Sequence, residues 1–540
     1  MRNARWNALL HAAAGTALVY ACPAWSTSVL LRPSDAPVLD QTADAPERPA
    51  SSAMPPIDQL ARPEEQAVLA EFARAMGGPD ARDPKTLLPV LDRILAKLPR
   101  PTMLRGYVQL VRAAVFGSLD RHAEAIAAVE ESIRLLPGYA GPLMTAAGIY
   151  LYSNNPGLAT DALIRASEID PEDVRRASDY ETSGLLQRLD AIRDQKRARL
   201  LSDRLLAIGW TGSGVASRSQ LAAMVIRQAM TEGDVARARS LVPNLLEPGA
   251  TYQLLADRGY EAIWPDLEKW AGPTLSRQWT IYLTEARKRW LASGELERGA
   301  DYASALRTAG DFDTIIAEFL PRFDKPVDPR RDWPLLFIAP KLVGALMTRG
   351  RTEDALGVYK KASQSWPIGS SANALNVYAN EANALLYADR PAEALAKIDA
   401  AIEDSHRWPG EINVDAVAGM HQTRACALHA LGRDAEAAIS ASIATQVGHA
   451  SQRAELALCM GKPAEAEAAL LRAFAVPEER TAAIGFMQPD SSPVMPTAYA
   501  RARRADLDAL RSSPRLLAAF APFGRILPFA LSDGAPKTAK

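Results

Sequence analysis

Two consecutive copies of one 34-residue helical pattern limit the fold of this chain more than any other feature of its sequence. Ala125 and Ala159 occupy the same position in the two copies, and Pro137 and Pro171 end them. Each copy has a first amphipathic helix, a polar turn, a second helix that carries the alanine, and a closing proline. Small residues let two antiparallel helices approach closely, while larger apolar residues fill the groove to the next pair. The segment 106–171 therefore predicts stacked helical hairpins.

The period and the residue classes together resemble the tetratricopeptide repeat family, which repeats every 34 residues. The sequence departs from the family pattern at Gln109 and Leu143, where a tryptophan is expected. A glycine or polar turn before an alanine-bearing helix returns weakly in the middle of the chain, at Gly233, Gly294 and Gly310. The resemblance implies an all-α fold, a right-handed α-solenoid of tetratricopeptide-like hairpins.

Four clearer copies follow in the second half of the chain. Their central alanines lie 39, 43 and 29 residues apart, at Ala355, Ala394, Ala437 and Ala466. Unequal intervals indicate loop insertions or shortened helices. The proline-bearing break after Gln488 leads to a segment that resembles the closing helices of bacterial tetratricopeptide proteins, and an open solenoid requires such a cap for solubility.

These patterns predict seven segments. They are a signal peptide (1–26), a flexible linker (27–64), an N-terminal repeat block (65–171), degenerate helical repeats (172–332), a C-terminal repeat block (333–487), capping helices (497–531) and a disordered tail (532–540).

The first residues have the pattern of an export signal. Arg2 and Arg5 precede a short apolar run, and a small-x-small cleavage site ends at Ser26. Export predicts a location in the periplasm or outer envelope of a bacterium. In an alternative reading the residues before Cys22 resemble a lipobox, and the protein is a lipoprotein anchored there. In another, this segment is an ordinary N-terminal helix and the protein is a cytoplasmic regulator.

Composition and motifs argue against several classes of function. The 62 basic and 63 acidic residues leave a net charge of −1, so the chain has no excess of positive charge with which to bind nucleic acid. The short signatures of metalloproteases, redox dithiols, P-loops and dinucleotide sites do not occur. His421 and His429 lie two helical turns apart, but no further ligand has suitable spacing for a metal site. We therefore expect no enzyme, no cofactor and no metal.

Cys426 and Cys459 remain in the mature chain if the signal peptide is removed. They fall in the first helices of adjacent repeats, about one turn apart in register. An oxidising compartment would permit a disulfide between the two repeats. Two buried, unpaired thiols at helix crossings are the favoured alternative.

The resemblance implies a scaffold that binds peptides or helices of other proteins in the concave groove formed by the first helices. The candidate groove residues are Gln109, Arg112, Tyr378, Asn380, Glu381, Asn383, Gln422 and Arg424. The alternative is an enzyme or glycan-handling protein whose site lies in the irregular middle region, 180–332. Its only support is a cluster of four tryptophans, Trp264, Trp270, Trp279 and Trp290. The favoured interpretation of this cluster is packing of the degenerate repeats, and a surface patch for ligand or glycan stacking is the alternative.

Overall fold

The structure, a computed structural model, describes residues 59–536 except 79–80, 82, 176, 213, 330, 409–411, 413 and 448–449. Within these residues the chain folds into helices and turns, and its β-structure is limited to one isolated antiparallel bridge between Asp257 and Gly524. The prediction of an all-α helical repeat fold is therefore confirmed. The expected signal peptide with Cys22, most of the expected linker and the last four residues lie outside the described residues.

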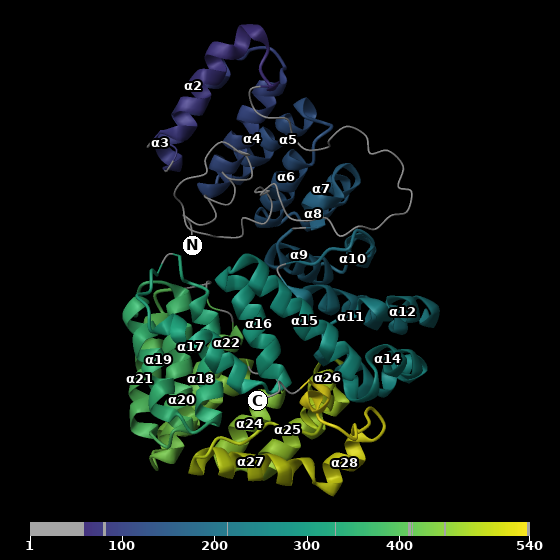
Figure 1. The fold of residues 1–540 in the computed structure, drawn as a ribbon, viewed down its shortest axis with the longest axis vertical. Helices are drawn as coiled ribbons and strands as arrows, with labels where there is room; N and C mark the ends of the chain where they lie inside the picture. The colour runs from purple at the N-terminus through teal and green to yellow at the C-terminus, as the bar shows by residue number, and fades with distance from the viewer. Residues whose placement is uncertain are drawn as a thin grey trace. The chain divides into compact units, whose positions relative to one another are not determined.

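The chain divides into two compact units, Met1–Ser213 and Gly214–Lys540 (Figure 1). The boundary falls in the glycine-rich segment that follows Trp210. The helices of the first unit are α2 (Gln66–Gly77), α3 (Pro84–Ala96), α4 (Met103–Ser118), α5 (His122–Leu135), α6 (Ala140–Tyr152), α7 (Pro156–Ile169), α8 (Pro171–Arg175), α9 (Asp179–Ala191) and α10 (Gln195–Ala207), after a 3₁₀ turn, η2 (Pro63–Glu65).

The two clear early repeats are the hairpins α4–α5 and α6–α7, and four later hairpins are α18–α19, α20–α21, α22–α23 and α24–α25. The central alanine of each hairpin is fully buried, with 0% of its surface exposed in Ala125, Ala159, Ala355, Ala394, Ala437 and Ala466. A larger side chain at these positions would force the two helices apart. The spacing of small residues therefore predicted the helix crossings correctly.

Most hairpins turn through the same backbone device. One residue of the turn has a left-handed backbone conformation, and the N–H of the following residue donates to the carbonyl five residues before it. At Asp389, for example, the N–H of Arg390 donates to the carbonyl of Leu385. Gly233 and Gly310 of the middle region adopt the same conformation, so these weak turns are hairpin turns. The device also interrupts the first unit at Arg193, where α9 ends and Asp194 caps α10.

The second unit begins with elements of uneven length, in which long and short helices are separated by 3₁₀ turns. They are α11 (Val215–Thr231), α12 (Val235–Leu241), η4 (Val242–Asn244), α13 (Pro248–Ala256), η5 (Arg258–Ile263), α14 (Trp264–Ala271), η6 (Pro273–Leu275), α15 (Ser276–Ser293), α16 (Leu296–Ala309) and α17 (Phe312–Phe323). The clear repeats follow as α18 (Leu335–Thr348), α19 (Thr352–Ser365), η7 (Ala372–Ala374), α20 (Leu375–Tyr387), α21 (Pro391–Ser405), α22 (Val414–Ala430), α23 (Asp434–Val447), α24 (Ala450–Cys459) and α25 (Pro463–Ala475). The last elements are α26 (Pro477–Phe486), α27 (Ala498–Arg511), α28 (Pro514–Phe520) and η8 (Leu531–Gly534).

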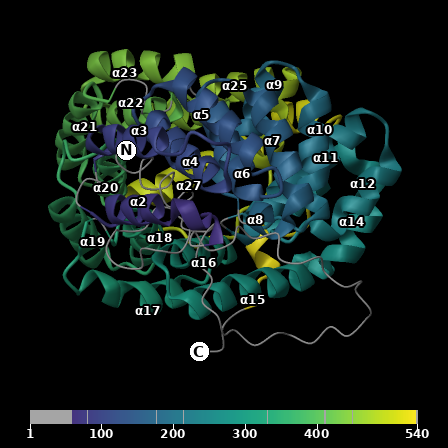
Figure 2. The same ribbon diagram turned by 90° about the horizontal axis from the view of Figure 1, so that it is seen from above.

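The second unit closes on itself. Helices α15 to α23 can be followed around its edge in Figure 2, and Figure 1 shows α26, in yellow, beside the teal helices from the start of the unit. Contacts between α13 and α26, and of η8 with η6 and α16, join the end of the unit to its beginning. The expected cap on an open end is therefore replaced by α27, which crosses α20, α24 and α25, and by a final segment that returns to α13–α16.

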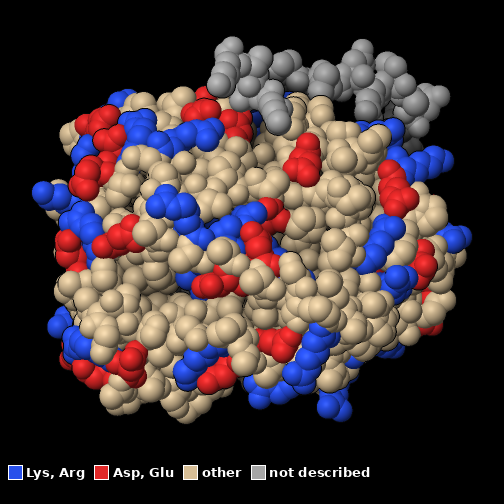
Figure 3. All heavy atoms as spheres, turned by 90° about the horizontal axis from the view of Figure 1, so that it is seen from below, with Lys and Arg blue, Asp and Glu red and all other residues tan. Residues whose placement is uncertain are grey.

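The end of the chain differs from the expected disordered tail. The fold continues through residues 532–536, because the indole N–H of Trp279 donates to the carbonyl of Leu531 at 2.8 Å and Asp533 caps the short helix η8. On the face shown in Figure 3, basic and acidic side chains are interspersed without a large area of one sign. Among the described residues, no helix combines the length and apolar character needed to cross a bilayer.

Candidate functional site

The first helices of the late hairpins lie side by side, so that α18 contacts α20, α20 contacts α22, and α22 contacts α24. Together with α27, the last three of these helices line a cavity of about 360 Å³. The cavity has an apolar wall that includes Leu386 and Met420, and a polar wall of amide, carboxyl and guanidinium groups.

Three asparagines form a row along the cavity side of α20. Asn376, Asn380 and Asn383 are four and three residues apart, and this spacing places them on one face of the helix. Within the described part of the chain, none of the three amides forms a hydrogen bond with another protein group. Gln422 of α22 adds a fourth amide on the opposite side of the cavity. Each asparagine amide offers two N–H donors and a carbonyl acceptor to whatever enters.

A buried arginine closes the end of the cavity. Arg503 of α27 is 8% exposed, and its Nη2 donates to the backbone carbonyl of Glu455 at 2.9 Å. Within the described ranges its Nη1 has no hydrogen-bond partner, and the carboxylate of Asp506 lies 3.7 Å away as an ion pair. Tyr387 and Tyr499 pack edge to face beside it, with ring centroids 5.2 Å apart.

The carboxyl of Glu455 faces this arginine from α24. Burial raises the pKa of Glu455 above its ordinary value, although Arg503, Arg511 and a hydrogen bond from Gln422 act in the opposite direction. The residue as a whole is exposed on α24, so this burial is the crowding of its carboxyl by protein atoms and not enclosure in the core. Burial also raises the pKa values of Tyr387 and Tyr499, so both phenols remain neutral donors.

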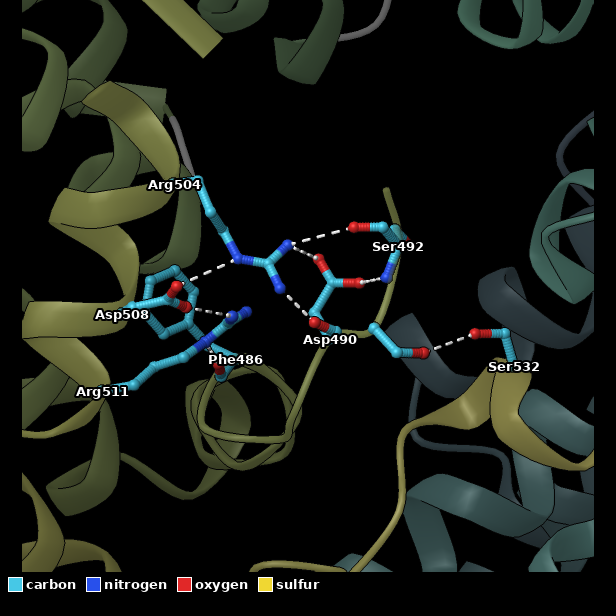
Figure 4. Close-up of polar contacts among 8 residues, drawn as sticks. Phe486, Asp490, Ser492, Arg504, Asp508, Arg511 and Ser532 are labelled. Atoms are coloured by element: carbon cyan, nitrogen blue, oxygen red, sulfur yellow. Dashed lines mark hydrogen bonds and ion pairs between the residues drawn. The ribbon is translucent and has the colours of Figure 1, made fainter. Parts of the chain in front are cut away.

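Helix α27 is held against the repeats at both of its ends. The carboxylate of Asp389, in the turn after α20, accepts hydrogen bonds from the backbone N–H groups of Ala498 and Tyr499 at 3.0 and 2.9 Å. Figure 4 shows the other contacts. Arg504 bonds to Asp490 in the preceding loop and to Asp508, and Arg511 donates to the carbonyl of Phe486. These contacts fix the direction in which Arg503 enters the cavity.

A disulfide joins Cys426 of α22 to Cys459 of α24, with the two Cα atoms 5.5 Å apart. Both residues line the cavity. The predicted placement on the first helices of adjacent repeats is confirmed, whereas the favoured prediction of unpaired thiols is wrong. At one turn apart in register, the two side chains meet across the contact between the helices, and the bridge fixes the separation of the cavity walls.

Three of the eight candidate groove residues, Asn380, Asn383 and Gln422, line the cavity. Two others lie on the same helices but bind neighbouring helices. Glu381 is 7% exposed and pairs with Lys397 of α21 at 2.9 Å. Arg424 pairs with Asp399 at 2.6 Å.

The remaining three candidates also have intramolecular partners. The hydroxyl of Tyr378 accepts a hydrogen bond from the backbone of Ile368 at 2.9 Å. In the first unit, buried Gln109 donates to Glu131 at 2.7 Å, and Arg112 pairs with Asp92 at 2.8 Å. The structure therefore brings together one cluster of candidates, on α20 and α22, and leaves the others dispersed.

Several cavity residues were missed by the sequence analysis. Asn376 extends the row of Asn380 and Asn383 by one turn, and this spacing was visible in the sequence. Tyr499 and Arg503 belong to α27, which was expected to cap the end of the stack. No local pattern indicated that this helix returns to α20.

The tryptophan cluster does not form a surface patch. Trp264, Trp279 and Trp290 are buried, and the indole N–H groups of Trp264, Trp270 and Trp279 donate to backbone carbonyls. Trp290 packs against Phe319. The middle region uses these rings to hold irregular hairpins together, so the favoured prediction that the cluster packs degenerate repeats is confirmed, and the alternative of an exposed stacking patch is wrong.

The two histidines of α22 have different surroundings. His421 is partly buried, burial lowers its pKa, and its Nδ1 lacks a hydrogen-bond partner. His429 Nδ1 lies 2.6 Å from a carboxylate oxygen of Asp434. In the part of the chain that the structure describes, no three His, Cys, Asp or Glu side chains are grouped as metal ligands.

Comparison with known proteins gives similarity at the level of the fold. No family model matches the chain. A search of curated proteins gives no match either. Solved structures that align with it include the tetratricopeptide domain of P58(IPK), with 15% identity over 76% of this chain and 98% of that one and a TM-score of 0.20. Yeast Tom70 aligns with 13% identity over 85% and 99% of the two chains and a TM-score of 0.30.

A structure of the APC/C hetero-tetramer Cut9–Hcn1 aligns with 12% identity, and the alignment covers 79% of this chain and 97% of that chain with a TM-score of 0.24. The structural neighbours are thus tetratricopeptide-domain proteins. The assignment of an all-α repeat fold rests on the hairpins of this chain.

Proposed function

We propose that this chain is a scaffold for protein–protein interactions, without catalytic activity of its own, and that the inner cavity of its second unit binds an extended segment of a partner protein. The observation that carries the proposal is the row of amides on α20, Asn376, Asn380 and Asn383, whose donors and acceptors have no partner among the residues that the structure describes. An extended segment presents main-chain N–H and C=O groups that match these amides. A helical segment already uses those groups internally.

The stiffness of the site supports the same function. Helix α22 is fixed to α24 by the disulfide, and α27 is capped by Asp389. A preformed site loses little conformational entropy when it binds, so a few hydrogen bonds give useful affinity. The apolar wall with Leu386 and Met420 supplies burial for a side chain of the partner.

We also propose that the protein works in the periplasm or outer envelope, after removal of residues 1–26. The disulfide supports this location, because such bonds persist in oxidising compartments. Cell fractionation and N-terminal sequencing test it. A mature chain that begins after Ser26 is expected. A lipid-modified Cys22 would indicate an anchored form, and an intact Met1 in the cytoplasmic fraction would contradict export.

Site-specific crosslinking tests the binding function. A photo-crosslinking residue at Asn380 is expected to capture a partner in living cells, whereas the same residue at exposed Ala396 on the outer helix α21 is not. Replacement of the other two amides, Asn376→Ala with Asn383→Ala, should abolish this capture. Their exposure predicts a stability change within about 0.5 kcal/mol. Equal capture at both sites, or capture that survives the double replacement, would contradict the proposal.

A further inference from the structure

The last segment of the chain binds the start of the second unit in the way that an extended peptide binds a receptor. We call residues 521–536 the C-terminal strap, and the surface of α13, η5, α14 and α15 beneath it the dock. The strap contains one short helical turn, η8, so most of its main-chain groups have no partner within the strap itself. The dock and the end of α26 supply those partners.

Main-chain pairing sets the register of the strap. The N–H of Arg525 donates to the carbonyl of Ala256, and the N–H of Arg258 donates to the carbonyl of Phe523, both at 2.8 Å. These two bonds form the isolated bridge between Asp257 and Gly524. On the other side, the amide of Gln488 donates to the carbonyl of Arg525 at 3.1 Å and accepts from the N–H of Leu527 at 3.0 Å. The strap is thus paired on two sides, as in β-strand addition.

Alternate side chains of the strap contact the dock. Arg525, Leu527 and Phe529 are two residues apart and are buried or half-buried, while Ile526 and Pro528 between them are exposed. This alternation is the period of an extended chain.

Arg525 makes three side-chain contacts with the dock. Its guanidinium carbon lies 3.7 Å from the ring centroid of Trp264, Nε donates to the carbonyl of Leu255 at 2.7 Å, and Nη2 donates to Glu268 at 2.9 Å. Farther along, the hydroxyl of Tyr252 donates to the carbonyl of Phe529 at 2.9 Å. The dock therefore contacts an arginine and an aromatic residue, and the aliphatic residue Leu527 between them is buried.

The strap also holds an unfavourable backbone in place. Thr274 and Leu275 have φ of 49° and 65°, a left-handed conformation that is unfavourable for branched side chains. η8 packs on this turn so closely that a Cβ on Gly534 would lie 1.8 Å from the carbonyl oxygen of Thr274. Release of the strap would let the turn relax. Local backbone strain of this kind lowers the free-energy cost of releasing the strap.

We propose that the dock is a peptide-binding surface whose resident ligand is the C-terminal strap, and that it accepts in its place an extended segment with the pattern Arg-x-aliphatic-x-aromatic. The strap opens as a unit while the helical repeats stay folded. This surface is separate from the inner cavity, so the proposal goes beyond the function given above and does not depend on it.

Hydrogen exchange of the full-length protein tests the opening. The N–H groups of Arg525 and Leu527 are expected to exchange at least tenfold faster than the core amides of α15 and α18, because the strap contains only one short helical turn and its other hydrogen bonds do not form a continuous ladder. Arg525→Ala should accelerate exchange of the strap amides by a further tenfold and leave α18 unchanged. Arg501→Ala, at an exposed position on α27, is the matched control and should change neither. Strap amides as slow as those of α15 would overturn the proposal.

Competition by a synthetic peptide of residues 521–536 tests the binding surface. The peptide should bind full-length Arg525→Ala protein at least tenfold more tightly than wild type, in which the tethered strap occupies the dock at high effective concentration. A peptide that itself carries Arg525→Ala should bind neither protein. Equal binding of the peptide to both proteins, or of both peptides to the variant, would show that the dock does not recognise this pattern.

Discussion

Cys426 of α22 and Cys459 of α24 are joined across two adjacent hairpins, 33 residues apart in the chain. The bridge lies in the wall of the inner cavity, next to Gln422 and Glu455. Stacked repeats normally adhere to their neighbours through apolar contacts alone, so each interface can open separately. Here one interface is covalent, and it is the one that shapes the cavity.

Reduction of this disulfide should destabilise the second unit. A bridge that closes a loop of this length contributes about 2–4 kcal/mol. We expect dithiothreitol to lower the urea midpoint of the second unit, and a double Cys426→Ala, Cys459→Ala variant to unfold at that lower midpoint with or without reductant. Alkylation of both thiols in native protein without reductant would show that the bond is absent.

The buried alanines should not tolerate enlargement. Ala394 is 0% exposed where α20 crosses α21. Ala394→Leu adds three carbons to a close-packed crossing, and overpacking of this kind typically costs about 1–3 kcal/mol. The matched control is Ala396→Leu on the exposed side of the same helix, which should leave the free energy of unfolding nearly unchanged. Chemical denaturation measures both, and equal losses would contradict the predicted crossing.

The sequence allowed the structural role of a residue to be predicted where the partners of that residue lie nearby in the chain. Small residues at a helix crossing repeat with the hairpin, so the burial of Ala125 and Ala394 followed from spacing. Turn chemistry is equally local, and Gly233 and Gly310 were recognised despite the drift of the surrounding repeats.

Contacts between distant segments leave no such pattern. Tyr252 donates to Phe529, 277 residues away, and Asp389 caps a helix that begins 109 residues later. Periodicity reports which face of a helix is apolar, but it does not say which segment covers that face. Glu381 was therefore assigned to the groove, whereas Lys397 of the next helix binds it. The position of α27 over α20 was unpredictable for the same reason.

Loss of the cap at Asp389 should loosen α27. Asp389→Asn keeps a residue that tolerates the left-handed backbone. It replaces the negatively charged carboxylate, which accepts hydrogen bonds from two backbone N–H groups at the start of α27, by a neutral amide. Loss of a helix cap costs about 0.5–2 kcal/mol. Hydrogen exchange in α27 should rise accordingly. Asp354→Asn, which removes only an exposed ion pair with Arg351, should have little effect, and an equal effect would contradict the capping role.

The raised pKa of Glu455 predicts how stability depends on pH. The folded protein binds the Glu455 proton more tightly than the unfolded chain, whose carboxyl has the ordinary pKa of 4.5. Stability therefore falls as the pH rises from 4.5 through the raised pKa, and at neutral pH the ionised carboxylate is destabilising. This destabilisation is reduced, but not abolished, by Arg503, Arg511 and Gln422. Glu455→Gln removes the charge and keeps an acceptor for Gln422.

Glu455→Gln should therefore raise the Tm at pH 7, and its advantage over wild type should shrink as the pH falls below 4.5, where the wild-type carboxyl is protonated in both states. Glu465→Gln, on an exposed position of α25, is the control and should give no gain at neutral pH. Thermal unfolding across this pH range measures the difference. An equal gain at every pH would assign the effect to packing, and a lower Tm at pH 7 would mean that the carboxylate is stabilised by Arg503 more than it is penalised by burial.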